Sequence, residues 1–233
     1  MSDERRRLLA ENARRRTLDD DRYQPWNRAE RFMLDDRRRR AAEMLERAGV
    51  FPGPTTRCLE VGFGDGTWLV DLLSFRVEET SLYGAEIDVT RAVSARRRLP
   101  SARLAVTGGA GLPYRGGAFS LVLASTVFTS ILDPAMQDDL AADMARVLAP
   151  GGALLFYDFA VDNPRNPHVR AVTRRRLREL FPTLHGDVRS ATLAPPISRR
   201  VAPLSVALAE LLGHIPLLRT HLLAVLIRPA AAG

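Results

Sequence analysis

Three glycines at alternate positions, Gly62, Gly64 and Gly66, follow a short apolar run that contains one acidic residue, Glu60. An apolar strand that ends in a glycine-rich turn and continues as a helix typically begins the nucleotide-binding sheet of an α/β domain. Phosphate-binding versions of this turn read G-x-G-x-x-G or G-x-x-x-x-G-K-[ST]. Here the spacing is Glu-x-Gly-x-Gly-x-Gly and the chain contains no lysine. Because a carboxylate disfavours phosphate, the pattern favours a cationic ligand.

Two further acids, Glu86 and Asp88, end a strand predicted over residues 81–88. In folds of this kind an acid at the end of the second strand, about 20 residues beyond the glycines, binds ribose hydroxyls. A carboxylate suits this role because it can accept both hydroxyl hydrogens at once.

Strands and helices alternate through the rest of the central sequence. Residues 104–106 and 118–125 read as strands, and the second is a continuous apolar run, as expected in the middle of a parallel sheet. A helix is predicted from Asp133, and Leu-Ala-Pro-Gly-Gly at 148–152 ends it before a strand over residues 153–159.

Residues 57–160 resemble the class I S-adenosylmethionine-dependent methyltransferases, type 11-like, in three motifs. These are the glycine turn, Gly-Ala-Glu-Ile at 84–87 and the junction at 148–152. The resemblance implies an α/β fold: a Rossmann-like, seven-stranded, mostly parallel sheet with an antiparallel last strand and helices on both faces. Strands six and seven are then expected over 188–193 and 222–227. Residues 57–233 would form the domain, with an insertion at about 194–218.

The resemblance also implies S-adenosylmethionine as cofactor, S-adenosylhomocysteine as product, and no metal. It assigns Glu60 to the methionyl ammonium and Glu86 to the ribose, while Asp88 caps the following helix. The other expected cofactor contacts are Tyr23, Gly62, Phe63, Gly64, Gly66, Ile87, Gly108, Gly109, Ala110 and Ser125. Gly108 departs from the family pattern because it stands where an aspartate usually contacts adenine. Ser120 departs too, since the family usually has aspartate there.

A polar segment, residues 157–170, follows the fifth predicted strand at the edge where a ligand is expected. One interpretation is a loop shaped by Asx and proline residues. The other is a substrate loop in which Asp158 or His168 acts as a base. The candidate substrate contacts are Trp26, Thr129, Tyr157, Asn163, Asn166 and Arg170.

Residues 1–56 are predicted to form a helical arm or lid. Residues 2–22 read as a frayed or helical arm, and a second helix begins after Asn27, which is placed to cap it. In the family such a helix closes over the cofactor, so Tyr23, Trp26 and Arg28 are candidate lid residues, with plain packing as the alternative. The apolar insertion is expected to carry one helix that forms a second lid, packs on the sheet or makes a dimer contact.

The net charge of +7 comes from arginines, many of them in the runs 5–7, 14–16, 37–40 and 174–176. We interpret these runs as solvated helix faces, because no aromatic residues interleave as single-stranded nucleic acid would require. The alternative is a surface for nucleic acid or an acidic membrane. The lone Cys58 excludes a disulfide framework, and the N-terminus has no signal-peptide core, so a cytoplasmic protein is expected.

The function implied is methyl transfer from a sulfonium by in-line displacement, with a base if the acceptor carries a proton. The pattern [DN]-P-P-[YF], used on nucleobase amines, does not occur after residue 125. We therefore expect a small organic acceptor, acidic or lipid-like and methylated on oxygen, no nucleic-acid partner, no transmembrane segment and a possible homodimer. The alternatives are an RNA or protein methyltransferase, or a cofactor-binding module that has lost catalysis.

Overall fold

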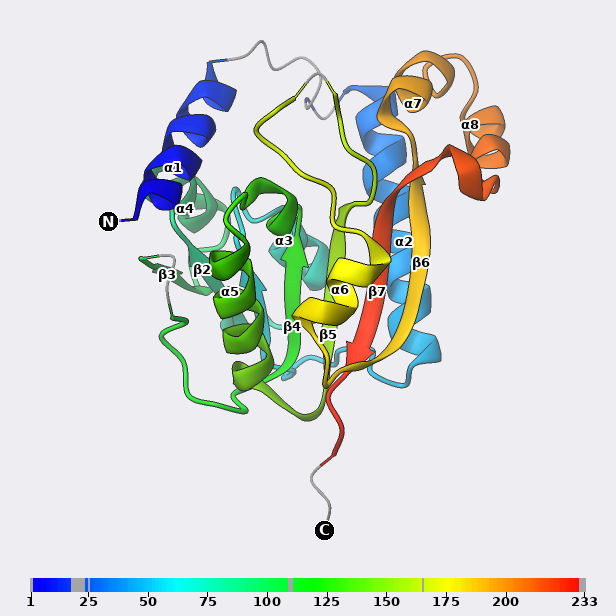
Figure 1. The fold of residues 1–233 in the computed structure, drawn as a ribbon. Helices are drawn as coiled ribbons and strands as arrows, with labels where there is room; N and C mark the ends of the chain where they lie inside the picture. The colour runs from blue at the N-terminus through cyan, green and yellow to red at the C-terminus, as the bar shows by residue number, and fades with distance from the viewer. Residues whose placement is uncertain (1, 18–23, 25, 109–110, 165, 231–233) are drawn as a thin grey trace.

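The computed structural model describes residues 2–17, 24, 26–108, 111–164 and 166–230 of the chain. Seven strands form one sheet in the order β3-β2-β1-β4-β5-β7-β6 (Figure 1). The strands are β1 (Cys58–Val61), β2 (Leu82–Glu86), β3 (Arg103–Val106), β4 (Phe119–Ser125), β5 (Leu148–Phe159), β6 (His185–Leu193) and β7 (Arg219–Ile227). Only β7 runs antiparallel to its neighbours, so the predicted sheet is confirmed.

The helices connect these strands and cover both faces of the sheet. The α-helices are α1 (Asp3–Arg16), α2 (Arg28–Arg47), α3 (Thr67–Ser74), α4 (Val89–Arg98), α5 (Pro134–Val147), α6 (Arg174–Leu180), α7 (Pro195–Val201) and α8 (Val206–Gly213). Among the described residues, single turns of 3-10 helix occur at η2 (Glu79–Ser81), η3 (Phe128–Ser130) and η4 (Pro216–Leu218). None of the helices in the described part of the chain is long and apolar enough to cross a membrane.

Side-chain oxygens cap the helices where the sequence predicts it. Asn27 accepts hydrogen bonds from the amides of residues 29 and 30, and Asp88 from those of residues 90 and 91. Asp133 and Thr173 cap α5 and α6 in the same way. Each cap satisfies an amide that has no partner inside its helix, so these boundaries follow from local sequence.

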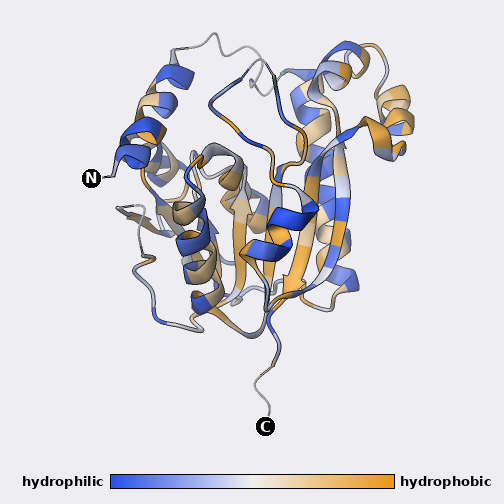
Figure 2. Cartoon of the chain, viewed as in Figure 1, coloured by the Kyte–Doolittle hydropathy of each residue, from blue (hydrophilic) through white to orange (hydrophobic). Residues whose placement is uncertain are grey.

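The sheet separates two apolar cores. Helices α2, α3 and α4 pack on one face, where Trp68 and Leu123 are buried, and α5 and α6 pack on the other, where Phe128 and Phe156 are buried. Figure 2 shows the apolar colouring concentrated on the central strands. The strand order reverses between β1 and β4, where the connecting helices change from one face of the sheet to the other. Ligands of such sheets bind outside the carboxyl ends of the strands at that point.

The insertion before β7 differs from the prediction. We expected one helix through residues 201–212, but α7 ends at Val201 and α8 begins at Val206. Pro203 lies between them, where its ring and its missing N–H oppose a continuous helix, and Ser205 caps α8 through the amide of Leu208. The break leaves much of the predicted apolar face exposed.

Gly84 provides a test of how tightly β2 is packed. A Cβ at this position would overlap the ring of Phe63 and lie 2.8 Å from Cδ2 of Leu104. We expect Gly84→Ala to lower the free energy of unfolding by about 1–3 kcal/mol through overpacking, measured by urea denaturation. Gly213→Ala is the matched control, because a Cβ there meets nothing within 4 Å. Equal stability of the two variants would contradict the close packing around β2.

Candidate functional site

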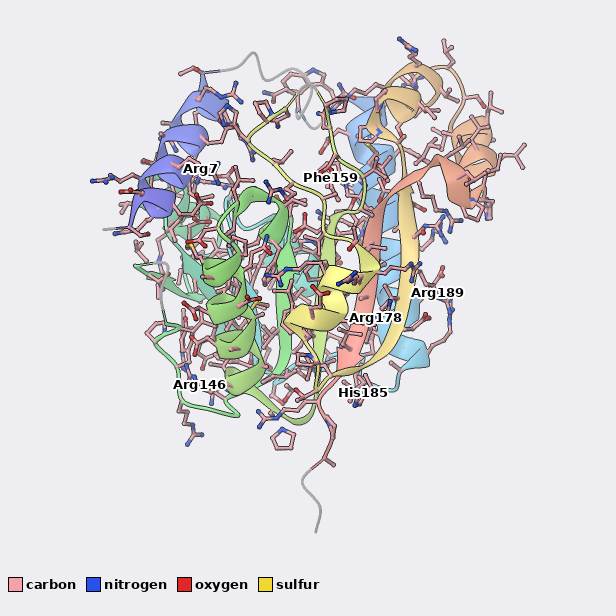
Figure 3. All side chains as sticks on the ribbon, in the orientation of Figure 1. Arg7, Arg146, Phe159, Arg178, His185 and Arg189 are labelled. Atoms are coloured by element: carbon pink, nitrogen blue, oxygen red, sulfur yellow. The ribbon has the colours of Figure 1, made fainter. Side chains whose placement is uncertain are left out.

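A crevice lies at the carboxyl ends of β1, β2 and β4, beneath α1. Its walls come from α1, the end of β1 and the glycine turn, the end of β2, α4, the segment after β3, the residues that follow β4, and α5. The lining residues are Leu8, Asn12, Arg15, Val61, Gly62, Ala85, Glu86, Ile87, Arg91, Thr107, Gly111, Leu112, Ser125, Thr126, Val127, Ser130, Ile131, Met136 and Leu140. In Figure 3, Arg7 and Phe159 mark the end of the molecule at which the crevice lies, and Arg146 marks the opposite end.

The turn after β1 needs its glycines for conformation and for space. Gly62, Gly64 and Gly66 have φ angles of 67°, 55° and 78°, in the left-handed region that side chains disfavour. A Cβ on Gly62 would lie 2.6 Å from Cγ2 of Val127, and one on Gly64 would overlap the guanidinium of Arg91. At Gly62 and Gly64 the turn therefore presents backbone, and not side chains, to a ligand.

Glu86 fastens the glycine turn to the end of β2. Its Oε2 accepts a hydrogen bond of 2.8 Å from the amide of Gly64, and its Oε1 accepts bonds of 2.8 and 3.0 Å from the amides of Ile87 and Asp88. The side chain is buried but lines the crevice. Each carboxylate oxygen can accept two bonds, so Oε2 retains capacity for a ribose hydroxyl. The sequence predicted that ribose contact but not the role of Glu86 in shaping the turn.

Glu60 carries a carboxylate oxygen with no hydrogen-bond partner. The residue is 3% exposed, and its Oε2 is one of the buried atoms left unpaired among the described residues. Burial raises the pKa of Glu60 well above its usual range, although the cation of Arg37 opposes the shift. An unpaired acceptor beneath the glycine turn, together with Glu86 at the ribose position, fits a ligand that carries an ammonium group and a ribose, as S-adenosylmethionine does.

Arg37 is buried, although it belongs to a run that we interpreted as a solvated face. Its guanidinium carbon lies 4.2 Å from the centre of the Trp68 ring, and its Nη2 lies 3.1 Å from Oδ2 of Asp71. The neighbouring arginines 38–40 instead pair with acids on their own helix. Only the tertiary fold, which places α2 against α3, separates Arg37 from the rest of the run.

Tyr157 lies on the α2 face of the sheet and not in the crevice wall. Its hydroxyl and that of Thr192 share a hydrogen bond of 2.8 Å, and its ring stacks on His221 with the centroids 4.8 Å apart. Burial, with a smaller contribution from the cation of Arg37, lowers the pKa of His221 to about 3. This buried polar layer supports β5 and β7 from behind, and the predicted substrate contact of Tyr157 is not among the crevice contacts.

Asp158 forms a buried hydrogen-bonded pair with Thr129. Its Oδ1 accepts a 2.5 Å bond from the Thr129 hydroxyl, and its Oδ2 accepts a 3.1 Å bond from the Thr129 amide. Burial raises the pKa of Asp158 to about 6, while the bonds from Thr129 lower it. The pair fixes η3, whose Ser130 lines the crevice, so both side chains position the wall and do not themselves line it. A catalytic role for Asp158 stays a prediction.

Thr126 adopts an unusual backbone conformation at the crevice. Its φ is 55°, a left-handed value that a β-branched residue rarely adopts. Its amide donates to the carbonyl of Tyr157 over 2.8 Å, which holds the strained residue at the end of β4. Strain of this kind commonly marks a site where a ligand must approach closely.

The loop after β5 lies between η3 and α1. The amide of Arg170 donates to the carbonyl of Thr129 over 2.9 Å, and Oδ1 of Asn166 accepts from the amide of His168 over 3.1 Å. Nε2 of His168 is 3.9 Å from Oε2 of Glu11 on α1. The structure thus brings His168 to the arm, whereas Asn163 and Arg170 are exposed.

Helix α1 forms the roof of the crevice, whereas the lid residues expected from the sequence lay later in the arm, at residues 23–28. Its Leu8, Asn12 and Arg15 line the crevice. Glu4 accepts a 2.6 Å hydrogen bond from the amide of Leu132, and Arg16 forms a 2.6 Å ion pair with Asp88. Arg7 also donates to the carbonyl of Ser130. In the local sequence, a cap and acid–arginine pairs three and four residues apart indicate that α1 is a helix, but they do not indicate what it covers.

The remaining predicted residues divide into four groups. Ile87 and Ser125 line the crevice; Phe63 and Gly66 are buried in the turn, where Phe63 packs against Gly84. Trp26 is 70% exposed and Gly108 is exposed, and neither is among the crevice residues. The predicted contacts that lie outside the described residues are Tyr23, Gly109 and Ala110.

The part of the chain that the structure describes offers no cluster of metal ligands. No group of three or more His, Cys, Asp or Glu side chains there is arranged to hold a metal ion.

Comparisons with known proteins agree with this geometry. Residues 58–152 match the family described as "Methyltransferase domain". No curated protein matches the sequence.

Solved structures resemble the chain over most of its length. A methyltransferase from Thermotoga maritima is 15% identical with a TM-score of 0.61, covering 96% of this chain and 98% of that one. Geranyl diphosphate C-methyltransferase from Streptomyces coelicolor A3(2), solved with S-adenosyl-L-homocysteine, is 16% identical with a TM-score of 0.59, covering 83% and 77%. A Haloferax volcanii methyltransferase, solved with the Trm112 activator, is 18% identical with a TM-score of 0.58, covering 91% and 98%. At these identities the likeness establishes the fold.

His221 makes a prediction about stability in acid. Because its pKa is about 3 in the folded chain and ordinarily about 6.5, the unfolded chain binds a proton first as the pH falls. Neutral His221 makes its full contribution to the free energy of unfolding above pH 6.5. Below pH 6.5 this contribution falls by about 1.4 kcal/mol per pH unit. Between pH 6.5 and 5, wild type should lose about 2 kcal/mol more stability than His221→Phe, measured by urea unfolding.

The comparison of wild type with His221→Phe separates this effect from that of Asp158. The raised pKa of Asp158 changes stability with pH in the opposite direction, but it does so equally in both proteins. The exposed His185 on β6 supplies the control, and His185→Gln should keep the wild-type dependence on pH. Parallel pH profiles for wild type and His221→Phe would contradict a buried neutral imidazole.

Proposed function

The chain carries a class I S-adenosylmethionine-dependent methyltransferase domain, and from that premise we propose that it methylates an oxygen of a small acidic or lipid-like acceptor. When bound, S-adenosylmethionine would supply an activated methyl group. The acceptor oxygen would form a bond to the methyl carbon in line with the breaking S–C bond, and S-adenosylhomocysteine would leave. Such a reaction needs the protein mainly for positioning and for excluding water.

The residues around the glycine turn would hold the cofactor. Glu86 would accept a ribose hydroxyl on Oε2, the carboxylate oxygen that accepts only one of its three amide bonds. The unpaired oxygen of Glu60 would receive the ammonium, whose charge favours the ionised carboxylate. Ile87, Thr107 and Leu112 line the part of the crevice assigned to adenine, where Gly108 contributes no carboxylate.

The roof made by α1 is the observation that carries the proposed acceptor class. Leu8 from α1 faces a wall that includes Ile131 and Met136, while Arg15 adds a guanidinium at the same opening. Arg91 on α4 is the second guanidinium in the lining. An apolar wall with two cations suits an acceptor that has an apolar body and an acidic group. Because α1 spans the crevice and is tied down on both sides, a small molecule fits this space better than a folded protein or an RNA helix.

The groups available for proton transfer are few. A carboxylate acceptor needs no base, whereas a hydroxyl acceptor would have to give up a proton. His168, beside Glu11 at the edge of the roof, is then our candidate base, and Asp158 fixes the wall through Thr129. We also propose that residues 1–56 form the lid of the site, and that α1 is the part of the lid that covers the crevice.

Glu86 provides the test of the cofactor site. We expect Glu86→Ala to weaken S-adenosylhomocysteine binding at least about tenfold, because the change removes the ribose acceptor and leaves three amides without their partner. Calorimetric titration measures this. Asp65→Ala is the matched control, an exposed acid in the same turn that does not line the crevice. Unchanged affinity in Glu86→Ala would overturn the assignment.

Arg15 provides the test of the acceptor class. Wild type is screened for methyl transfer to carboxylic acids, phenols, isoprenoid and fatty alcohols, amines and RNA. On an acidic acceptor, Arg15→Ala should lower kcat/KM roughly 10- to 100-fold, as expected for loss of one charge-assisted hydrogen bond. Arg14→Ala is the control, because Arg14 pairs with the same Glu11 but is not among the crevice residues. Transfer to amines or RNA alone would reject the proposed class.

A further inference from the structure

The connection between β6 and β7 exposes an apolar surface that no described part of the chain covers. We call it the α7–α8 surface, and its exposed side chains are Leu204, Val206, Leu208, Leu211, Ile215 and Leu217. Leu204 is 86% exposed and Leu217 is 94% exposed. Figure 2 shows α8 and the turn after it as a largely apolar projection beyond the edge of the sheet.

This exposure is not a consequence of ordinary amphipathic packing. Helix α8 already buries one side, where Ala209 and Leu212 pack with Phe32 of α2. Its other side presents Leu208 and Leu211 where a surface helix normally carries polar residues. Large contiguous apolar patches on soluble proteins mark sites of association.

The surface does not cover the crevice, which removes the lid role expected from the sequence. Neither α7, α8 nor η4 contributes a residue to the crevice wall, since these elements pack on α2 and β6. They nevertheless lie at the same edge of the sheet, because Phe159 at the end of β5 pairs with His221 near the start of β7. Figure 1 shows α7 and α8 at the end of the molecule that also carries α1.

Arginines border the α7–α8 surface. Arg28 donates to the carbonyl of Pro203 over 3.1 Å, and a groove between α2 and α8 is lined by Arg28 and Arg31 together with Leu204 and Val206. Arg199 and Arg200 are exposed on α7. The same groove also contains three acids, Asp35, Asp36 and Glu210. Asp35 and Asp36 pair with Arg38 and Arg39 of the same helix. Arginines therefore still outnumber acids around the exposed leucines.

We propose that the α7–α8 surface docks the chain on an anionic lipid bilayer. Leucines 204 and 217 would enter the boundary between headgroups and acyl chains, and the bordering arginines would contact lipid phosphates. A helix of eight residues is too short to span a bilayer, so the contact is peripheral. The crevice would then open near the membrane surface.

The charge of the border argues against a second copy of the chain as the occupant. In a twofold interface the same patch meets itself, so the arginines of α2 and α7 would lie close to their own counterparts. Anionic headgroups instead offer the opposite charge along the whole border. Lipid docking requires neither cofactor nor acceptor, so its test is independent of the proposed methyl transfer.

Co-sedimentation of the full chain with vesicles tests the proposal. Vesicles of phosphatidylcholine alone are compared with vesicles that also contain phosphatidylglycerol. We expect binding to the anionic vesicles, little binding to the neutral ones, and weaker binding in high salt because salt screens the arginines. Equal binding to both kinds of vesicle, or no binding to either, would overturn the proposal.

Variants separate this surface from the general charge of the chain. Leu204→Gln/Leu217→Gln should reduce vesicle binding at least about tenfold with an unchanged melting temperature, because both side chains are almost fully exposed. Val93→Thr/Val106→Thr, which changes two half-exposed residues on α4 and β3, should bind like wild type. Arg199→Gln/Arg200→Gln should reduce the preference for phosphatidylglycerol.

Light scattering after size-exclusion chromatography completes the test. We expect a wild-type chain whose mass in solution does not change in the double leucine variant. A wild-type dimer that becomes a monomer in this variant, with no vesicle binding, would assign the α7–α8 surface to a second copy and overturn the proposal.

Discussion

The carboxylate of Glu86 ends β2 and, through three backbone amides, fixes the glycine turn that follows β1. The turn can form only with glycines, because Gly62 and Gly64 are left-handed and have no room for a Cβ. A buried carboxylate that accepts three amide bonds is satisfied without a cation, so the adjoining crevice wall remains rigid. The rest of the site is arranged around this bond network, with Glu60 below it and the end of β4 beside it.

Polar groups behind the sheet support the crevice without lining it. The Asp158–Thr129 pair fixes η3, and Arg37 lies between Trp68 and Asp71 beneath the glycine turn. Buried networks of this kind determine geometry more than net stability, since desolvation offsets much of what their bonds contribute. Their position directly behind the crevice wall accords with that role.

The carboxyl edge of the sheet combines two kinds of surface. Helix α1 closes the crevice with Leu8 and Arg15, and the α7–α8 surface exposes leucines beside arginines. Both pair apolar area with guanidinium groups, which retain their charge in every environment. An acidic acceptor with a lipid-like body would suit both surfaces, and this chemistry links the crevice to its surroundings.

Sequence alone was sufficient for features that depend on neighbouring residues. The alternating glycines, the acid that ends β2, the caps at Asn27 and Asp88 and the apolar strands all follow from local spacing and backbone chemistry. Tertiary structure alone decided that α1 is the part of the arm that roofs the crevice, that Arg37 is buried while Arg39 of the same run is exposed, and that the apolar face after α7 remains exposed. These three outcomes depend on contacts between segments that are far apart in the chain. The sequence of a helix does not show whether that helix covers a crevice, packs on a sheet or stays exposed.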